Sequence, residues 1–250
     1  MRRSTLFVIL MLTAALTGCG AGDVPQPGGA GEAAPSGGGI QVRVTGEPIP
    51  EEPVETAPAV LPADPALAEI PETGTAAWEL EDGVLTISGS GVLSERSWEK
   101  EYHDETVQSI TKVLIGNGVI DLPYSAFGDH DSLVSVAMGD GFTYVPPETF
   151  IRCTSLKEVR FGANVTFIDG GAFERCGLEE IAIPDTVTFI NIGAFAKCES
   201  LEKIWIPASV TEIGEDAFEG CEKLTIFAPP GSCAEAYARE NNIPFFGTEP

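Results

Sequence analysis

The chain has 250 residues, which is enough for one or two domains, and acidic residues outnumber basic ones by 38 to 14. The net charge of −24 excludes a nucleic-acid footprint, because phosphate contacts depend on clustered Lys and Arg. The same charge would repel an anionic membrane surface. It indicates a soluble surface or, alternatively, a cationic partner.

The first 18 residues have the pattern of an export signal. The positive Met1-Arg2-Arg3 precedes a largely apolar run from Leu6 to Leu16. This run is too short to span a bilayer, which favours a signal peptide. It ends in Leu16-Thr17-Gly18-Cys19, which resembles a bacterial lipobox. The resemblance implies cleavage before Cys19 and its diacylation, and two acyl chains suffice for stable anchoring. The alternative is an ordinary secretory signal with a coincidental cysteine.

Residues 19–73 are predicted to be a tether. They are dominated by Gly, Pro, Ala and Glu, contain almost no aromatic residues and show no sustained periodicity. Such a chain cannot bury enough apolar surface to offset its conformational entropy. We therefore expect a disordered spacer that gives clearance above the cell envelope.

Residues 74–109 are predicted to cap the N-terminal side of the domain that follows. The segment from Trp78 to Ile87 has a turn signal at Asp82-Gly83, which is typical of a β-hairpin. Residues 94–109 are polar and carry no clear pattern, so no element is predicted there.

Residues 110–250 contain a repeat with a period of 22 or 23 residues. Its clearest marker is a small residue followed by Phe, at Ala126-Phe127, Thr149-Phe150, Ala172-Phe173, Ala194-Phe195 and Ala217-Phe218. Three residues after each Phe stand His130, Cys153, Cys176, Cys198 and Cys221. A fixed period of this length predicts a solenoid.

The best-preserved unit runs from Leu201 to Cys221, as LEKIWIPASVTEIGEDAFEGC. It resembles the BspA-type (treponemal-type) leucine-rich repeat family, whose units read L-x-x-I-x-I-P-x-S-V-T-x-I-G-x-x-A-F-x-x-C. The resemblance covers residues 110–226 closely. It implies a right-handed coil of about five units. One departure puts local loop geometry in doubt, because the unit beginning at Leu178 is one residue short after Cys176.

The residue pattern within a unit predicts the same architecture. The alternation of Val159 and Phe161 with polar residues is typical of a half-buried strand, and the spacing of Ala172, Phe173 and Cys176 favours a short helical turn. One unit buries too little to fold alone, so the units must stack. The predicted fold class is therefore an α+β repeat solenoid of short strands and short helical turns.

The C-terminal end carries the signals of a helical cap. Ser232 stands three residues before Glu235, which is a capping-box spacing. A short helix is expected from Ala234 to Glu240, with residues 243–246 folding back over the last coil.

The cysteines and histidines predict packing rather than chemistry. Four cysteines share one repeat column, so we expect reduced, buried thiols; Cys233 falls at the start of the capping helix, where a surface thiol is expected. His130 takes the place of a column cysteine and is expected to pack at the inner edge, and His103 is expected to be solvated. No hydrolase, metalloprotease or phosphate-loop motif is present in the sequence. We therefore predict no catalytic residue, metal or cofactor.

A ligand-binding surface is predicted on outward aromatic residues. In the pattern V-T-x-I the residue x points outward, and that column holds Asp121, Tyr144, Phe167, Phe189 and Glu212. The three rings would form a contiguous apolar stripe, which is typical of an interaction site. The alternative is that the rings only stack on one another. Trp205 is a further outward aromatic, in the column of Leu114, Ala137, Arg160 and Ala182.

The function favoured by these features is a non-catalytic, surface-exposed lipoprotein. It would present a binding module to a protein ligand on a host, a matrix or a neighbouring cell, as the family resemblance implies. Its location would be extracytoplasmic, anchored through Cys19 to the cell membrane or the outer membrane. Two alternatives remain, an envelope-structural or carbohydrate-contacting lipoprotein and a hydrolase with its site in residues 75–109.

Overall fold

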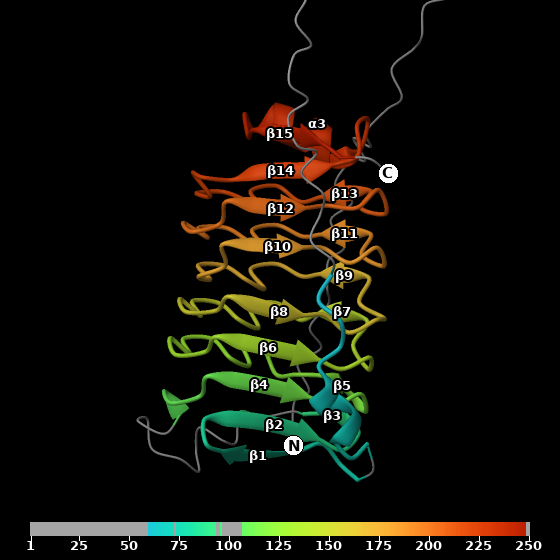
Figure 1. The fold of residues 1–250 in the computed structure, drawn as a ribbon, viewed down its shortest axis with the longest axis vertical. Coiled ribbons are helices and arrows are strands. Elements are labelled where there is room, and N and C mark those ends of the chain that lie inside the picture. The colour runs from blue at the N-terminus through green and yellow to red at the C-terminus, as the bar shows by residue number, and fades with distance from the viewer. Residues whose placement is uncertain (1–59, 73, 94–95, 97–106, 249–250) are drawn as a thin grey trace, which may run out of the picture. The chain divides into compact units, whose positions relative to one another are not determined.

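The computed structural model describes residues 60–72, 74–93, 96 and 107–248. Within them the chain forms a stack of coils, one for each repeat, with strands on two sides (Figure 1). The predicted export signal, Cys19, most of the predicted tether and His103 lie outside the described residues. No helix among the described residues is long and apolar enough to cross a membrane.

Each coil places one strand on a broad face, which we call the long face. Its strands are β1 (Ala77–Glu81), β2 (Val84–Ser88), β4 (Lys112–Ile115), β6 (Ser135–Met138), β8 (Glu158–Arg160), β10 (Glu180–Ala182), β12 (Lys203–Trp205), β14 (Thr225–Ala228) and β15 (Phe245–Gly247). They form a five-stranded sheet, β1-β2-β4-β6-β8, and a four-stranded sheet, β10-β12-β14-β15. The broad arrows of Figure 1 show this ladder of strands.

Shorter strands form a second side of the stack, which we call the short face. They are β3 (Gly91–Val92), β5 (Val119–Asp121), β7 (Tyr144–Val145), β9 (Phe167–Ile168), β11 (Phe189–Ile190) and β13 (Glu212–Ile213). Strands β7, β9, β11 and β13 make one parallel sheet, and β3 pairs with β5.

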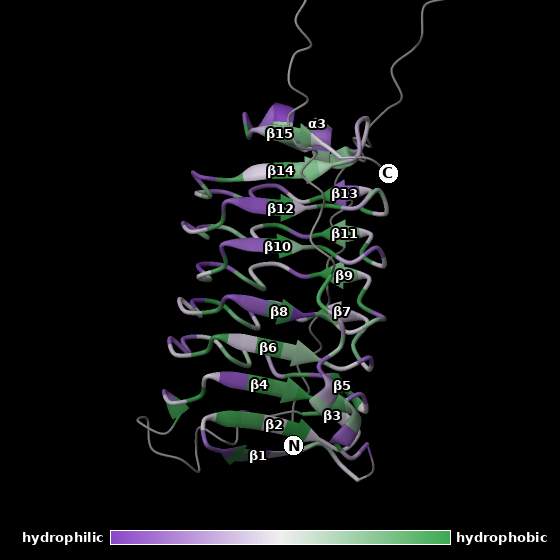
Figure 2. Cartoon of the chain, viewed as in Figure 1, coloured by the Kyte–Doolittle hydropathy of each residue, from purple (hydrophilic) through white to green (hydrophobic). Residues whose placement is uncertain are grey.

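Parallel pairing sets equivalent residues of successive repeats side by side. Val113 pairs with Val136, and Val136 pairs with Val159. Their side chains are buried, whereas polar residues begin β4, β8, β10 and β12 (Figure 2). The alternation predicted around Val159 and Phe161 is confirmed, and so is the repeat solenoid. The number of coils is nearer six than the five expected, because β14 begins a further coil that ends in the capping helix.

The core is a continuous column of stacked phenylalanine rings. Phe127, Phe150, Phe173, Phe195 and Phe218 have successive centroid separations of 5.5, 5.4, 5.2 and 5.6 Å. These rings are 0–3% exposed. The column therefore passes through every coil in which the sequence predicted an inward Phe.

The segments around these rings are turns and do not become the short helices that the spacing suggested. In one coil Glu148 and Arg152 have φ values of 52° and 60°, in the left-handed region. Arg175 and Lys197 repeat the second of these positions, each with a φ of 59°. A left-handed residue on each side of a single turn stops a right-handed helix from continuing.

The long face is interrupted where the short repeat unit begins. Strands β8 and β10 belong to different sheets, and the loop between them carries Gly177. A Cβ atom added to Gly177 would lie 2.0 Å from the carbonyl oxygen of Thr154, so a larger residue does not fit there. The sheet of the long face is thus divided at the unit that is one residue short. We call the interruption the seam.

The two ends of the stack are capped as expected. The hairpin of β1 and β2 pairs Trp78 with Ile87 across the predicted turn. Helix α3 spans Cys233–Glu240 with Ser232 as its N-cap, and β15 pairs with β14. The predicted hairpin and helical caps are confirmed.

The predicted tether boundary is wrong at its C-terminal end. Residues 60–72, which we call the strap, contain the 3₁₀ helix η1 (Pro65–Glu69). Leu67 and Ile70 are only 4% and 8% exposed. The prediction rested on the average composition of residues 19–73, which does not reveal two single apolar residues. It also passed over the pair Asp64-Pro65, which is typical of a helix start.

Candidate ligand-binding surface

The predicted aromatic stripe is present on the short face. Parallel pairing places Tyr144 beside Phe167 and Phe167 beside Phe189. Their ring centroids are 6.4 Å apart in the first pair and 5.0 Å in the second. All three side chains are half-buried. We call these three residues the aromatic stripe.

The rings of the stripe stack face to face. The planes of Phe167 and Phe189 differ by 6°, and those of Tyr144 and Phe167 by 29°. Both faces of Phe167 are therefore covered within the stripe, whereas Tyr144 and Phe189 each have one face covered by a neighbouring ring. A stacked row of apolar rings suits packing against another apolar surface, whereas a sugar ring stacks on an open aromatic face.

Acidic residues surround the tyrosine end of the stripe. The Tyr144 hydroxyl donates a hydrogen bond of 3.0 Å to the carboxylate of Asp121. Burial and this hydrogen bond raise the pKa of Tyr144 to about 12, and the charge of Asp169 acts in the same direction. The phenol therefore stays neutral at physiological pH and is held in a fixed orientation. Glu212 ends the column beside Phe189.

Several exposed apolar residues of the same coils were not singled out from the sequence. Ile120, Tyr124 and Ile192 are 51%, 62% and 53% exposed. A signal was available, because other units carry Thr at the position of Ile120, and Pro147, Gly170 and Glu215 stand in the column that Tyr124 and Ile192 share. Scoring each repeat column for unexpected apolar residues would have found them.

Trp205 is not the exposed contact that the sequence predicted. Its side chain is only 6% exposed, and its ring stacks on Phe227 at 5.1 Å. Phe246 continues the same outward column, 5.5 Å from Phe227. The repeat alignment could not show this, because β14 and β15 lie beyond the well-preserved units. Within the described residues the buried indole N–H of Trp205 makes no hydrogen bond.

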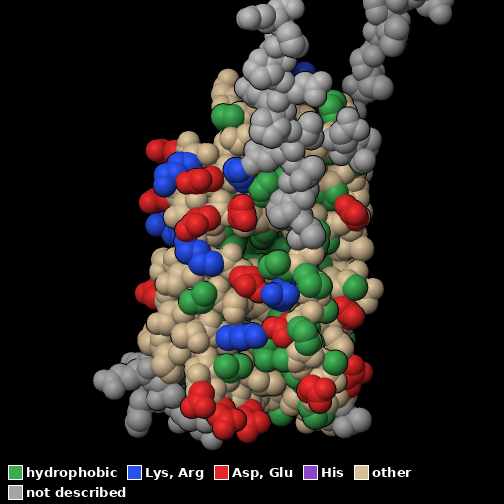
Figure 3. All heavy atoms as spheres, viewed as in Figure 1, with side chains coloured by type: hydrophobic (Ala, Val, Ile, Leu, Met, Phe, Trp, Pro, Cys, Tyr) green, Lys and Arg blue, Asp and Glu red, His purple; other side chains and the backbone are tan. Residues whose placement is uncertain are grey.

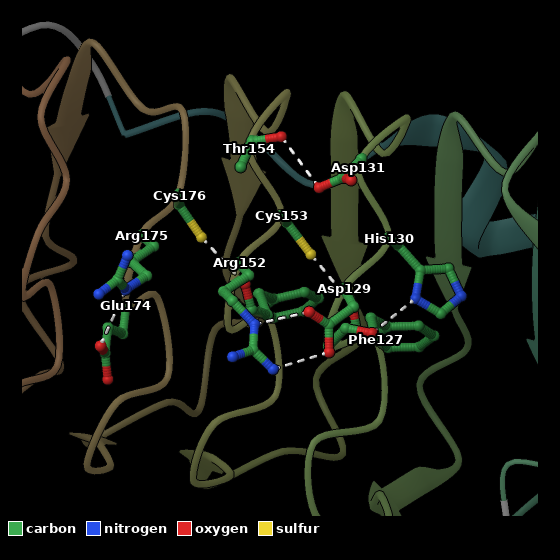
Figure 4. A network of polar contacts seen from close by, with 12 residues as sticks. Phe127, Asp129, His130, Asp131, Arg152, Cys153, Thr154, Glu174, Arg175 and Cys176 are labelled. Atoms are coloured by element: carbon green, nitrogen blue, oxygen red, sulfur yellow. Dashed lines mark hydrogen bonds and ion pairs between the residues drawn. The ribbon is translucent and has the colours of Figure 1, made fainter.

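The repeat cysteines are buried thiols, as predicted. Cys153, Cys176, Cys198 and Cys221 form no disulfide, and each donates an S–H hydrogen bond of 3.0–3.1 Å to the carbonyl of a core Phe in the preceding coil. Figure 4 shows two of these contacts. Burial raises the pKa of Cys153 to about 12 and that of Cys176 well above its usual range. Buried neutral thiols are poor nucleophiles.

The polar side chains next to these thiols form hydrogen bonds with one another, between neighbouring coils. Arg152 donates two hydrogen bonds, of 2.6 and 2.9 Å, to the carboxylate of Asp129, and Thr154 donates to Asp131 (Figure 4). The guanidinium lowers the pKa of Asp129. Nearby, His130 is 2% exposed with its Nδ1 atom 3.2 Å from the Gly128 carbonyl oxygen. The Arg152–Asp129 and Thr154–Asp131 contacts join neighbouring coils, and His130 packs inside as predicted.

No metal centre is formed by the part of the chain that the structure describes, since no three His, Cys, Asp or Glu side chains come together there. On the long face, Lys and Arg lie beside Asp and Glu and do not form a patch of one sign (Figure 3). The Lys157–Glu179 pair, at 2.6 Å, is one example.

Comparison with known proteins identifies the repeat. Residues 120–239 match the model of the BspA type leucine rich repeat region in six copies. No curated protein sequence matches the chain.

Solved structures of bacterial leucine-rich repeat proteins are similar to this chain. One from Bacteroides ovatus is 23% identical, with a TM-score of 0.49, and the match covers 61% of this chain and 45% of that one. A leucine rich cell surface protein from Faecalibacterium prausnitzii is 34% identical, with a TM-score of 0.45 and coverages of 51% and 34%. A leucine-rich repeat protein of T. pallidum is 22% identical, with a TM-score of 0.46 and coverages of 61% and 68%. The matches span less than half the length of the first two proteins. By its period, its core columns and its match to the family model, the segment of residues 120–239 is a BspA type leucine rich repeat region.

Proposed function

We propose that this protein is an extracytoplasmic, lipid-anchored binding module that captures a protein ligand through the aromatic stripe of Tyr144, Phe167 and Phe189. The observation that carries the proposal is the run of three half-buried rings on adjacent coils, at a position that solvated repeats fill with polar residues. Repeat solenoids offer long faces of this kind to their ligands.

The chemistry of the stripe favours a protein ligand over a carbohydrate. Its rings stack on one another, so the middle ring offers no open face to a sugar, and the row packs well against aliphatic and aromatic side chains. Acidic residues at both ends, Asp121 and Glu212, complement a ligand whose apolar contact is flanked by Lys or Arg. Aromatic residues are also enriched in the central parts of protein interfaces.

The test is capture of purified matrix proteins by the immobilised full chain, with a glycan array measured in parallel. Fibronectin, laminin and collagen serve as probes. The triple variant Tyr144→Ser, Phe167→Ser, Phe189→Ser is expected to abolish capture. Its melting temperature should change little, because each lost cross-strand pair is worth about 0.2–1 kcal/mol.

A matched control removes exposed apolar side chains elsewhere. Val134 and Phe246 are 43% and 37% exposed and lie outside the stripe, so Val134→Ser with Phe246→Ser should leave capture intact. Capture that persists in the triple variant would show that the stripe is only scaffold. Capture confined to the glycan array would favour the carbohydrate-contacting alternative.

A further inference from the structure

The strap, residues 60–72, covers outward positions of the long face. Leu67 and Ile70 pack with Leu114 of β4 and Ala137 of β6 in a small apolar cluster that is separate from the core. Leu114 and Ala137 are 7% and 1% exposed although they point away from the core. In Figure 1 the strap runs along the stack, across several coils.

Polar contacts hold the strap in one register. Lys112 forms a 2.7 Å ion pair with Asp64, whose carboxylate also caps η1 by accepting from the backbone N–H of Ala66. Arg160 donates a 2.8 Å hydrogen bond to the carbonyl of Pro62. Its guanidinium is oriented by Glu158, at 2.7 Å. One carboxylate and one backbone carbonyl of the strap are thus recognised by two basic side chains of the long face.

The residues through which the strap makes contact follow a period of three. Leu61, Asp64, Leu67 and Ile70 stand three residues apart. Leu61 lines a pocket of about 120 Å³ at the seam, together with Val159, Ile181 and Ala182. The 3₁₀ and polyproline conformations, both with three residues per turn, place such residues on one side of the chain. The strap therefore lies on the sheet as a short linear peptide lies in a binding site.

The fit is close at Ile70. A Cβ atom added to Gly116 would lie 2.7 Å from the Cγ2 atom of Ile70, so the strap occupies space that any larger residue at position 116 would take. This part of the long face is shaped for the side chain that it holds.

We propose that the outer surface of β4, β6 and β8, built from Lys112, Leu114, Ala137 and Arg160, is a peptide-binding site whose resident occupant is the strap. Its external partner is a linear peptide of the same chemistry, with an acidic residue followed by apolar residues at the third and sixth positions. The strap competes in cis at an effective concentration that reaches millimolar for short linkers. The external peptide therefore binds only when the strap is detached.

The experiment uses the full chain and a fluorescently labelled synthetic peptide of residues 60–72 as the probe, followed by fluorescence anisotropy. The variant Leu67→Ser with Ile70→Ser detaches the strap without changing the surface beneath it. We expect this variant to bind the peptide at least tenfold more tightly than the parent chain, because the cis competitor is weakened. Circular dichroism establishes that the variant is folded.

A second change tests the location of the site. Ala137→Arg in the detached variant should abolish peptide binding, and the strand face tolerates this side chain because Arg160 occupies the same column one coil away. Asp64→Ala, which removes the cap and the ion pair alone, is the milder means of detachment if the double variant does not fold. A folded, detached chain that fails to bind the peptide would overturn the proposal. Binding that equals the parent's, or that survives Ala137→Arg, would also overturn it. The stripe variants leave this binding unchanged, so the two proposals fail separately.

Discussion

Each buried thiol of the cysteine column has its hydrogen-bonding capacity satisfied by the backbone. The S–H groups donate to carbonyls of the preceding coil, for example Cys176 to Phe150 at 3.1 Å. A cysteine at this position fills a small apolar space and also joins two coils. This arrangement accommodates four aligned cysteines without a disulfide among them.

The raised pKa of Cys153 predicts a specific pH dependence. The unfolded thiol ionises near pH 9 and the folded one near pH 12, so the folded state loses stability as pH rises between these values. Cys153→Ala removes this loss. Its destabilisation relative to the parent should therefore shrink by about 1 kcal/mol between pH 7 and pH 10. Urea unfolding at both pH values measures the difference, and an unchanged gap would contradict the prediction.

The phenylalanine column predicts a large penalty for truncation. Phe173 is fully buried, stacked between Phe150 and Phe195 and edge-on to Phe161 at 6.1 Å. Phe173→Ala should cost about 3–5 kcal/mol, because it leaves a cavity at the centre of the stack. Tyr124→Ala, at a ring that is 62% exposed, is the control and should cost far less. A Phe173→Ala chain that unfolds at the parent's urea concentration would contradict this packing.

At the level of elements, helix α3 closes the open end of the stack. The Glu235 N–H donates to the Ser232 side chain at 3.3 Å, and the Glu235 carboxylate accepts from the Gly231 N–H. The helix in turn sets the ring of Tyr237 edge-on against Phe218 at 5.7 Å. The cap of the helix thus supports the last ring of the core column.

Removal of the cap residue should loosen this closure. Ser232→Ala is expected to destabilise the chain by about 1 kcal/mol, whereas Ser232→Asp keeps an acceptor and should be close to neutral. Hydrogen exchange of the α3 amides is the local measurement. Equal protection in both variants would show that docking of Tyr237, and not capping, holds the helix.

Elements that recur in every repeat could be predicted from the sequence, whereas elements that occur a single time in the chain could not. The inward columns recur at a fixed period, so the strands, the core rings and the aromatic stripe followed from spacing. The strap consists of single contacts such as Asp64 with Lys112, 48 positions apart, which no period reveals. Trp205 was misplaced for the same reason, because its stacking partner Phe227 belongs to the cap.

At the scale of the whole molecule, the predicted lipid anchor at Cys19 would attach the protein to a membrane. We expect Cys19→Ala to move the protein from the membrane fraction to the soluble extracellular or periplasmic fraction, because acylation depends on that thiol. Fractionation with immunoblotting of both forms measures this. Membrane retention of the variant at the parent's level would argue against lipidation.

The position of the strap between the N-terminal segment and the solenoid has a mechanical consequence. A force applied at the N-terminal side acts on the strap before it acts on any coil. The strap lies along the stack and is held to it by a few side-chain contacts. Its 13 residues correspond to up to about 45 Å of contour length. Peeling them away would lengthen the connection first, while the hydrogen-bonded coils stay folded. Under tension from flow or from a captured ligand, the strap would detach first, and the added length would delay unfolding of the repeat domain.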